Sequence, residues 1–304
     1  MMNAIQGELN QYYQRVGIDQ VDGTNGYAKR FRAFGCPKKD CCRDACYDYW
    51  KKGEEDIFCF SPPIDSVCVS QYYTDKTYCG DSIPRIVVLS LSAPKPSMPT
   101  DEDNTRPLGS YTHWRETLAM VRSLLHPFIA PEKFPKPIRN WEDEDITIVE
   151  SLFVHARTAK CCSNAYGGKE EHTKVYENCS GYLSEEMGIL EPDVIITQGK
   201  HGNPPCSKAR VERYVFQNYQ KVTNIQGIDP VHNVAHVATL KCNSRPVFWL
   251  QLYHPRYAGG YRLEAGEIVS EINGVAAIRE NFVYYGKEIK KFMDNPKTYC
   301  TIGQ

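Results

Sequence analysis

The sequence predicts an α/β fold, because short apolar runs alternate with amphipathic helical patterns along much of its 304 residues. Four runs are apolar almost throughout, which is typical of strands buried on both faces of a parallel sheet. They are IVVLSL (86–91), IVESLFV (148–154), DVIIT (193–197) and VFWLQLY (247–253). We therefore expect a three-layer α/β/α sandwich around a central, mostly parallel, four-stranded sheet with right-handed crossovers.

Helical patterns lie between and after the predicted strands. In HWRETLAMVRSLL, Thr112 is a candidate N-cap and the apolar residues form one stripe along the helix. These residues are Trp114, Leu118, Val121 and Leu125. A second helix is expected from about 174 to 187, and a third over FVYYGKEIKKFM near the C-terminus. Proline-rich stretches at 94–107 and 127–139 predict long loops.

The overall composition is that of an ordinary globular protein, with 41% hydrophobic and 24% charged residues. A net charge of −1 excludes binding to nucleic acid through overall positive charge, so any DNA contact needs a local basic face. The N-terminal residues lack the basic end and apolar core of a signal peptide, and no apolar run approaches the roughly 20 residues of a membrane span. We expect a monomer without membrane contact in a reducing compartment, cytoplasmic or nucleoid-associated.

The 13 cysteines include two groups that lie far apart in the sequence. One group is Cys36, Cys41, Cys42 and Cys46, and the other is Cys161, Cys162 and Cys179. Structural disulfides are rare in a reducing compartment, and the odd count argues against a complete disulfide framework. We expect thiolates from both groups to bind one metal centre. A 4Fe–4S cluster suits four such ligands, and zinc is the alternative.

This centre predicts how the chain is organised. The first eighty residues are rich in Tyr, Cys, Lys and Asp and show little clean periodicity. We expect residues 1–80 to form a Cys-rich segment with short helices, held by the metal centre on a core domain of residues 81–304. Because ligands of parallel sheets bind beyond the carboxyl ends of the strands, the segments after the predicted strands are the candidate site.

Four motifs follow or span those strands in order. The first strand runs into Ser92-Ala93-Pro94, and the second leads to Lys160-Cys161, followed by ENCSGYL (177–183). The third strand lies within EPDVIITQG (191–199), and the fourth ends in Tyr253-His254-Pro255. Over about residues 80 to 262, this series resembles the uracil-DNA glycosylase superfamily, most closely its iron–sulfur branch, families 4 and 5.

The resemblance implies a DNA glycosylase that flips a nucleotide out of single- or double-stranded DNA and hydrolyses its N-glycosidic bond, leaving an abasic site. It implies Cys161 and Cys179 as ligands of a structural iron–sulfur cluster. The branch supplies the other ligands from a Cys-x-x-Cys pair, which this chain lacks. The spacings Cys36-x4-Cys41, Cys36-x5-Cys42 and Cys42-x3-Cys46 remain open, and we take Cys36, Cys42 and Cys46 as the candidates.

The resemblance also implies catalytic roles. His254 would donate a hydrogen bond to the base oxygen that becomes negative as the bond breaks. A carboxylate would orient the attacking water, and Asp101, Glu102 or Asp103 could supply it. Ser92 occupies the position next to Ala-Pro and could hold a water by hydrogen bonding. The structural alternatives are a strand-end histidine bonded to the backbone and a solvated acidic loop.

The remaining candidates would contact the base or the DNA. They are Ala93, Pro94, Lys95, Arg157, Arg256, Tyr257 and Arg262. Basic and aromatic residues with glycines, as in 256–262, suit a loop that enters the minor groove and holds a base out of the stack. Arg157 stands where family 4 has the asparagine that reads uracil, and Lys95 replaces a loop glycine. Arg157 could equally form a salt bridge with one of the acidic residues.

These departures favour a specialised substrate over plain uracil. A deaminated purine would indicate DNA repair, and a hypermodified base, such as a bulky modified pyrimidine in phage DNA, would indicate antiphage defence. Two alternatives belong to other classes. One is a non-catalytic iron–sulfur protein of the same fold that binds nucleic acid, and the other is a zinc-stabilised interaction module.

Overall fold

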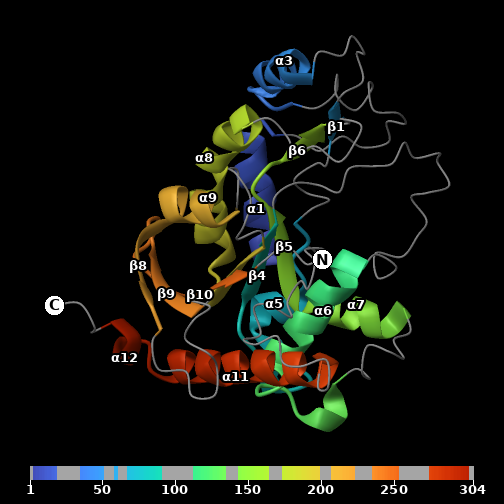
Figure 1. The fold of residues 1–304 in the computed structure, drawn as a ribbon, viewed down its shortest axis with the longest axis vertical. Coiled ribbons are helices and arrows are strands. Elements are labelled where there is room, and N and C mark those ends of the chain that lie inside the picture. Colours follow the sequence, from blue (N-terminus) through green and yellow to red (C-terminus); the bar gives the residue numbers. More distant parts are fainter. Residues whose placement is uncertain are drawn as a thin grey trace.

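A computed structural model describes most of the chain. The described residues are 3–18, 35–50, 58–60, 67–90, 112–134, 143–163, 173–198, 207–222, 235–252 and 274–300. Its centre is a six-stranded sheet (Figure 1). The strands are β4 (Ile86–Ser90), β5 (Phe153–Arg157), β7 (Val194–Gln198), β8 (Phe216–Lys221), β9 (Ala235–Leu240) and β10 (Pro246–Leu252). Their order across the sheet is β5-β4-β7-β10-β9-β8.

The predicted α/β fold is confirmed, but the predicted number of strands was wrong. Strands β5, β4, β7 and β10 correspond to the four apolar runs and are parallel to one another. Strand β9 is antiparallel to β10, and β8 is antiparallel to β9, so the sheet is mixed. Strand β8 reads FQNYQK and is largely exposed, because it lies at the edge of the sheet. A polar edge strand lacks the apolar run by which the buried strands were recognised.

The second strand also lies later in the chain than predicted. Most of the run at 148–154 belongs to helix α7 (Asp143–Ser151), and β5 begins only at Phe153. Val149 is buried and Ile146 packs against the same core, a spacing of three that suits one face of a helix. A short apolar run fits a buried helix as well as a buried strand, which explains the error.

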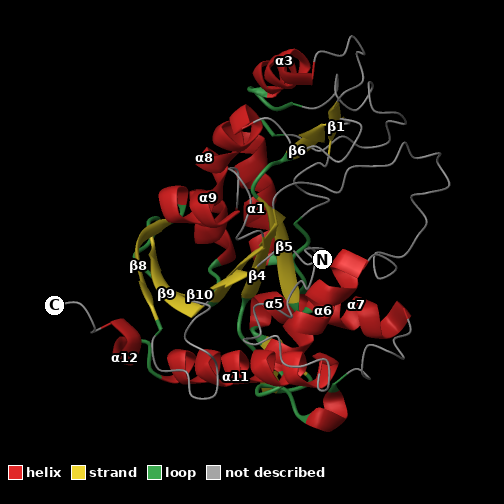
Figure 2. Cartoon of the chain, in the orientation of Figure 1, coloured by secondary structure: helices red, strands yellow, loops and turns green. Residues whose placement is uncertain are grey.

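Helices cover both faces of the sheet (Figure 2). On one face lie α1 (Ala4–Arg15), α8 (Thr173–Leu190) and α9 (Ser207–Tyr214). On the other lie α6 (Thr112–Leu125), α7 and α11 (Gly274–Asp294). Helices α6, α8 and α11 are the three predicted helices, and α8 and α11 are longer than expected. None of the helices in the described ranges has the length and apolar character to span a bilayer.

Shorter elements complete the described structure. They are the helices α3 (Lys39–Trp50), α5 (Gln71–Asp75), η3 (Pro131–Lys133) and α12 (Lys297–Cys300), and the strands β1 (Phe58–Phe60), β2 (Thr77–Tyr78), β3 (Asp81–Ser82) and β6 (Cys161–Ser163). Strand β1 pairs with β6, and β2 with β3. The first pair joins the N-terminal part of the chain to the segment that begins at Cys161.

The N-terminal segment also shares the apolar core. Leu9 and Tyr13 of α1 are fully buried in the same cluster as Val87 and Leu89 of β4. The alternate residues of β4, such as Val88, face the other core beneath α6 and α11. Helix α1 therefore packs on the sheet through apolar contacts that are independent of any metal.

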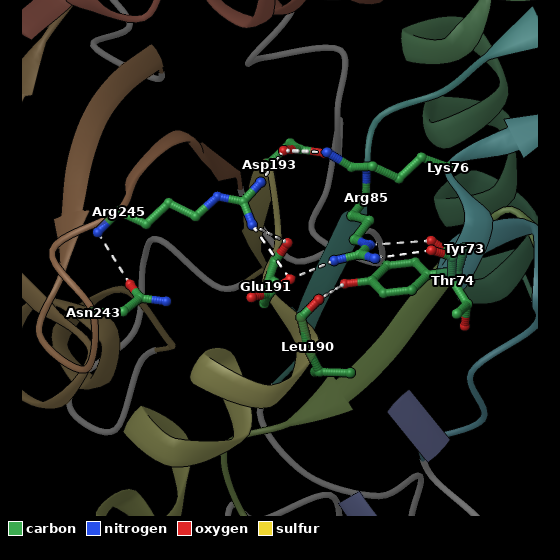
Figure 3. Close-up of polar contacts among 9 residues, drawn as sticks. All are labelled: Tyr73, Thr74, Lys76, Arg85, Leu190, Glu191, Asp193, Asn243 and Arg245. Carbon is green, nitrogen blue, oxygen red and sulfur yellow. Dashed lines mark hydrogen bonds and ion pairs between the residues drawn. The ribbon is translucent and has the colours of Figure 1, made fainter. Parts of the chain in front are cut away.

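Charged residues clamp the amino ends of three neighbouring strands (Figure 3). Asp193, just before β7, accepts a hydrogen bond from the backbone N–H of Arg85, 2.9 Å away, just before β4. The same carboxylate pairs with Lys76 at 2.8 Å and with Arg245, which precedes β10. Arg85 also pairs with Glu191 at 2.8 Å. This network lies at the edge opposite the carboxyl ends of the strands, so we assign it a role in stability.

Asp193→Asn is expected to lower the free energy of unfolding by about 2–3 kcal/mol, because hydrogen bonds to a buried charge are stronger than neutral ones. The Asp193 side chain is only 9% exposed, so water replaces few of the interactions that the substitution weakens. Urea denaturation of the two proteins measures the difference. The exposed Asp75→Asn, on α5, is the control and should change stability by less than about 0.5 kcal/mol.

Candidate functional site

Thiols from the two distant cysteine groups meet beside α8. The side-chain amide of Asn178 lies 3.2 Å from Cys42 Sγ, and the next residue is Cys179. Cys36 and Cys42 both lie near enough to Cys179 for a negative charge on Cys179 to raise their pKa. All three thiols are buried. We call Cys36, Cys42 and Cys179 the thiol site.

Helix α3, which carries Cys42, packs against α8, and Cys36 lies just before α3. The backbone N–H of Cys42 donates to Lys38 O at 3.0 Å, which fixes Cys42 in the first turn of the helix. The Lys38 ammonium lies 3.4 Å from Asn178 O and 6.0 Å from the centre of the Tyr182 ring. Tyr182 also forms a hydrogen bond with the Cys36 thiol. The surface through which α3 contacts α8 is therefore polar and rich in sulfur.

The segment that leads to Cys161 approaches the thiol site from the sheet. The backbone N–H of Lys160 donates to Cys179 Sγ at 3.3 Å. Cys161 follows directly as the first residue of β6, where it pairs with Phe60 of β1. The backbone thus brings Cys161 next to Cys179. For Cys161 and Cys46, the other two predicted ligands, the structure describes the backbone alone.

Burial controls the protonation of these thiols. It raises the pKa of Cys36, and it raises the pKa of Cys42 to about 12. The hydrogen bond from Asn178 lowers the pKa of Cys42 and so opposes the effect of burial. Without a cation the two thiols therefore keep their protons at neutral pH, and a metal would have to displace them. Buried sulfur donors suit iron–sulfur clusters and zinc better than hard cations. Among the described residues, no group of three or more Cys, His, Asp or Glu has the arrangement of a site for a metal ion.

A buried ion pair lies next to the thiol site. The Lys160 ammonium is 2.7 Å from Glu186 Oε2, and each side chain is 1% exposed. The ammonium also donates to Arg157 O at 2.9 Å, and the Tyr13 hydroxyl donates to Glu186. Burial and the Glu186 charge hold the pKa of Tyr13 well above its usual value. These contacts join α1, the end of β5 and α8.

Polar side chains gather at the carboxyl ends of the parallel strands, on the face covered by α6. Ser90, the last residue of β4, lies with its Oγ 2.8 Å from His155 Nε2 on β5. The Trp114 ring of α6 packs on His155 with ring centres 4.8 Å apart. Gln198 at the end of β7 donates to Thr117 of α6 at 2.8 Å. We call Ser90, Thr117, His155 and Gln198 the polar edge.

The polar edge was not predicted from the sequence. Two features of the sequence could have indicated it. Ser90 lies two residues before the candidate Ser92, and His155 lies two residues before the candidate Arg157. Residues two apart in a strand lie on the same face, so His155 shares a face of β5 with Arg157. Arg157 itself ends β5 at this edge and is paired in register with Ser90. These polar side chains lie where parallel sheets bind their ligands.

Most of the predicted catalytic and DNA-binding residues lie outside the described residues. They are Ser92, Ala93, Pro94, Lys95, Asp101, Asp103, His254, Arg256, Tyr257 and Arg262. The described chain stops at Ser90 before the first of these segments and at Leu252 before the second, which are the carboxyl ends of β4 and β10. The roles predicted for these residues stay predictions.

The sequence matches no known protein-family profile, and no curated protein is significantly similar to it.

Proposed function

We propose that the protein is a DNA glycosylase that hydrolyses the N-glycosidic bond of a damaged or modified base and carries a structural 4Fe–4S cluster. The observation that carries the proposal is the meeting of Cys36 and Cys42 with Cys179. The sequence motifs predict that Cys179 lies close to the N-terminal cysteines, although more than a hundred residues separate them in the chain. Apolar packing alone gives no reason for buried thiols of both groups to lie near one another, whereas a shared metal centre would give one.

The cluster would be held by Cys36, Cys42 and Cys179 together with Cys161 or Cys46. The donor type fits, because Cys36, Cys42 and Cys179 are buried thiols drawn from both cysteine groups, but these three alone do not have the arrangement of a metal-ion site, so a fourth thiol is required. When bound, the cluster supplies a covalent link between the N-terminal segment and the core domain. It takes no part in the hydrolysis. Visible absorbance at roughly 400 nm in anaerobically purified protein distinguishes it from zinc, which gives a colourless protein.

The sheet supports the catalytic part of the proposal. Strands β4 and β10 flank β7, so their carboxyl ends are separated by about 10 Å, twice the spacing between strands. The chain continues from β4 towards Ser92 and from β10 towards His254. A flipped base bound beyond this edge would be read by polar groups from both sides.

The reaction consumes one water for each base released. The bond between the base nitrogen and the sugar C1′ breaks, and its electron pair leaves with the base. His254 would stabilise the negative charge that develops on a base oxygen. Asp101 or Asp103 would orient the water that adds to C1′ and would stabilise the cationic sugar. The water proton ends on the released base, and the DNA keeps an abasic site.

His254→Ala is expected to reduce base release by about 100-fold or more, the usual loss when a hydrogen-bond donor to a developing anion is removed. The test uses duplex and single-stranded oligonucleotides that carry uracil, hypoxanthine or a bulky modified pyrimidine. Alkaline cleavage of the strand reports each abasic site. His126→Ala, an exposed residue after α6, is the control and should retain wild-type activity.

Two results would contradict the proposal. One is wild-type protein that contains its metal and binds DNA but cleaves none of these substrates. The other is cleavage that His254→Ala leaves unchanged. The first result would identify a non-catalytic nucleic-acid-binding protein.

A further inference from the structure

Asn178, on α8, lies close to two cysteines of the N-terminal group. Its Nδ2 atom lies 3.2 Å from Cys42 Sγ and 3.9 Å from Cys41 Sγ. Its backbone oxygen accepts from the Lys38 ammonium at 3.4 Å. Cys179, its neighbour in the sequence, belongs to the thiol site. Asn178 therefore lies between the thiols of the N-terminal segment and the thiol of the core.

Helix propensity gives no reason for asparagine at this position. Asn178 lies in the second turn of α8, beyond the N-cap position at which its side chain would favour the helix. Inside a helix, asparagine is a weaker former than alanine, leucine or glutamate. The contacts of the side chain with sulfur offer the missing reason. An amide N–H is also the type of donor that stabilises sulfur once the sulfur becomes a thiolate.

Besides the backbone N–H of Lys38, which donates to Cys36, the thiol site receives two N–H donors from the core part of the chain. Lys160 donates its backbone N–H to Cys179 at 3.3 Å, and Asn178 donates its side-chain N–H to Cys42. Lys160 and Asn178 both lie in the core part of the chain. One reaches the core thiol and the other reaches the N-terminal thiol. Substitution removes the Asn178 donor alone, whereas the Lys160 N–H is part of the backbone.

We propose that Asn178 is a positioning residue of the metal centre. Its side-chain amide holds Cys42 in place and stabilises the Cys42 thiolate by hydrogen bonding. The inference rests on the proposed metal centre and goes beyond it, because it assigns a role outside the ligands. Residues that hydrogen-bond to metal ligands commonly change metal affinity by 10- to 100-fold. Hydrogen bonds to the sulfurs of an iron–sulfur cluster also shift its reduction potential.

The test compares Asn178→Leu and Asn178→Asp with wild type, all purified anaerobically. Leucine removes the donor, and aspartate removes it while keeping the shape of the side chain and adding a negative charge near the thiolates. We expect metal loss to a chelator, followed by visible absorbance and by iron or zinc content, to be about 10-fold faster for Asn178→Leu. Loss from Asn178→Asp should be faster still. If the metal is iron, its reduction potential should fall in Asn178→Leu, because the lost donor favours the more negative reduced state.

Two controls separate this role from an effect on the helix. Glu177→Gln changes the exposed neighbouring position and should leave metal loss at the wild-type rate. Asn178→Gln keeps an amide donor on a longer side chain and should restore part of the retention lost in Asn178→Leu. Far-ultraviolet circular dichroism should be the same for all the variants, because leucine and glutamine are good helix formers.

The outcomes distinguish this inference from the proposed function. Wild-type and Asn178→Leu proteins that hold equal metal and lose it at equal rates would overturn the role of Asn178 and leave the glycosylase proposal intact. Wild-type protein without iron or zinc would overturn both the metal centre and this inference. Faster loss from Asn178→Leu and Asn178→Asp, with retention by Glu177→Gln, would establish the role even if no glycosylase substrate were found.

Discussion

Glu186→Gln is expected to lower the free energy of unfolding by about 3–5 kcal/mol, the largest effect that we predict for a single side chain. Glu186 and Lys160 form an ion pair in which each side chain is 1% exposed. Glutamine keeps the size of the side chain and can still accept a hydrogen bond. It removes the negative charge, however, and leaves the Lys160 ammonium buried without a counter-ion. Water cannot reach the ammonium to compensate.

The neighbouring residue gives a matched control. Glu185 pairs with Arg15, so this pair also joins α8 to α1, but the two side chains are 52% and 64% exposed. Glu185→Gln should change the free energy of unfolding by less than about 1 kcal/mol, because solvent screens exposed ion pairs. Urea denaturation of both variants gives the comparison. Equal effects of the two substitutions would contradict the role that we give to burial.

A double substitution separates the cost of an isolated charge from the value of the pair. Lys160→Met combined with Glu186→Gln removes both charges, fills a similar volume and leaves an amide oxygen that can accept from the Tyr13 hydroxyl. We expect this protein to recover most of the stability lost in Glu186→Gln, because burying two charges is itself unfavourable. The contact of Lys160 with Cys179 uses the backbone N–H and remains available. A lower metal content in this variant, with stability restored, would show that the ion pair also orients the thiol site.

The sequence predicted the central strands well where burial on both faces of the sheet dominated the choice of residues. IVVLS and VIITQ became β4 and β7, because strands with helices on both faces must be apolar on both faces. The same rule failed for β8, whose exposed polar residues resemble those of a loop. It also placed β5 too early, since the run around Val149 fits a helix as well. Periodicity identifies burial, and burial alone does not decide between a strand and a short helix.

The thiol site was predictable in part because cysteine carries chemistry that few other residues share. The grouping of the cysteines and the position of Cys179 were enough to expect its approach to Cys36 and Cys42. The polar edge was not predictable in the same way. Ser90 and His155 are common residues, and their proximity depends on the register of two strands far apart in the sequence. The Asp193 clamp depends likewise on three strand ends that only the folded sheet brings together.

Cys179→Ser is expected to abolish most metal binding, the second large effect that we predict. A serine hydroxyl does not replace a thiolate as a soft ligand, and α8 contains no other cysteine. The apparent binding energy of structural metal sites is about 10–16 kcal/mol in small zinc domains, so loss of one ligand should also weaken the attachment of α3 to α8. Visible absorbance and metal content measure the first effect. Amide hydrogen exchange in residues 39–50 measures the second and should become at least about 10-fold faster.

Cys68→Ser is the matched control, because Cys68 is an exposed cysteine outside the thiol site. Its metal content and its exchange in α3 should equal those of wild type. The two variants together separate a shared metal centre from a general sensitivity to the loss of a thiol. Wild-type metal content in Cys179→Ser would exclude Cys179 as a ligand. Unchanged exchange in α3 after loss of the metal would show instead that the contacts of Lys38, Asn178 and Tyr182 suffice to hold α3 on α8.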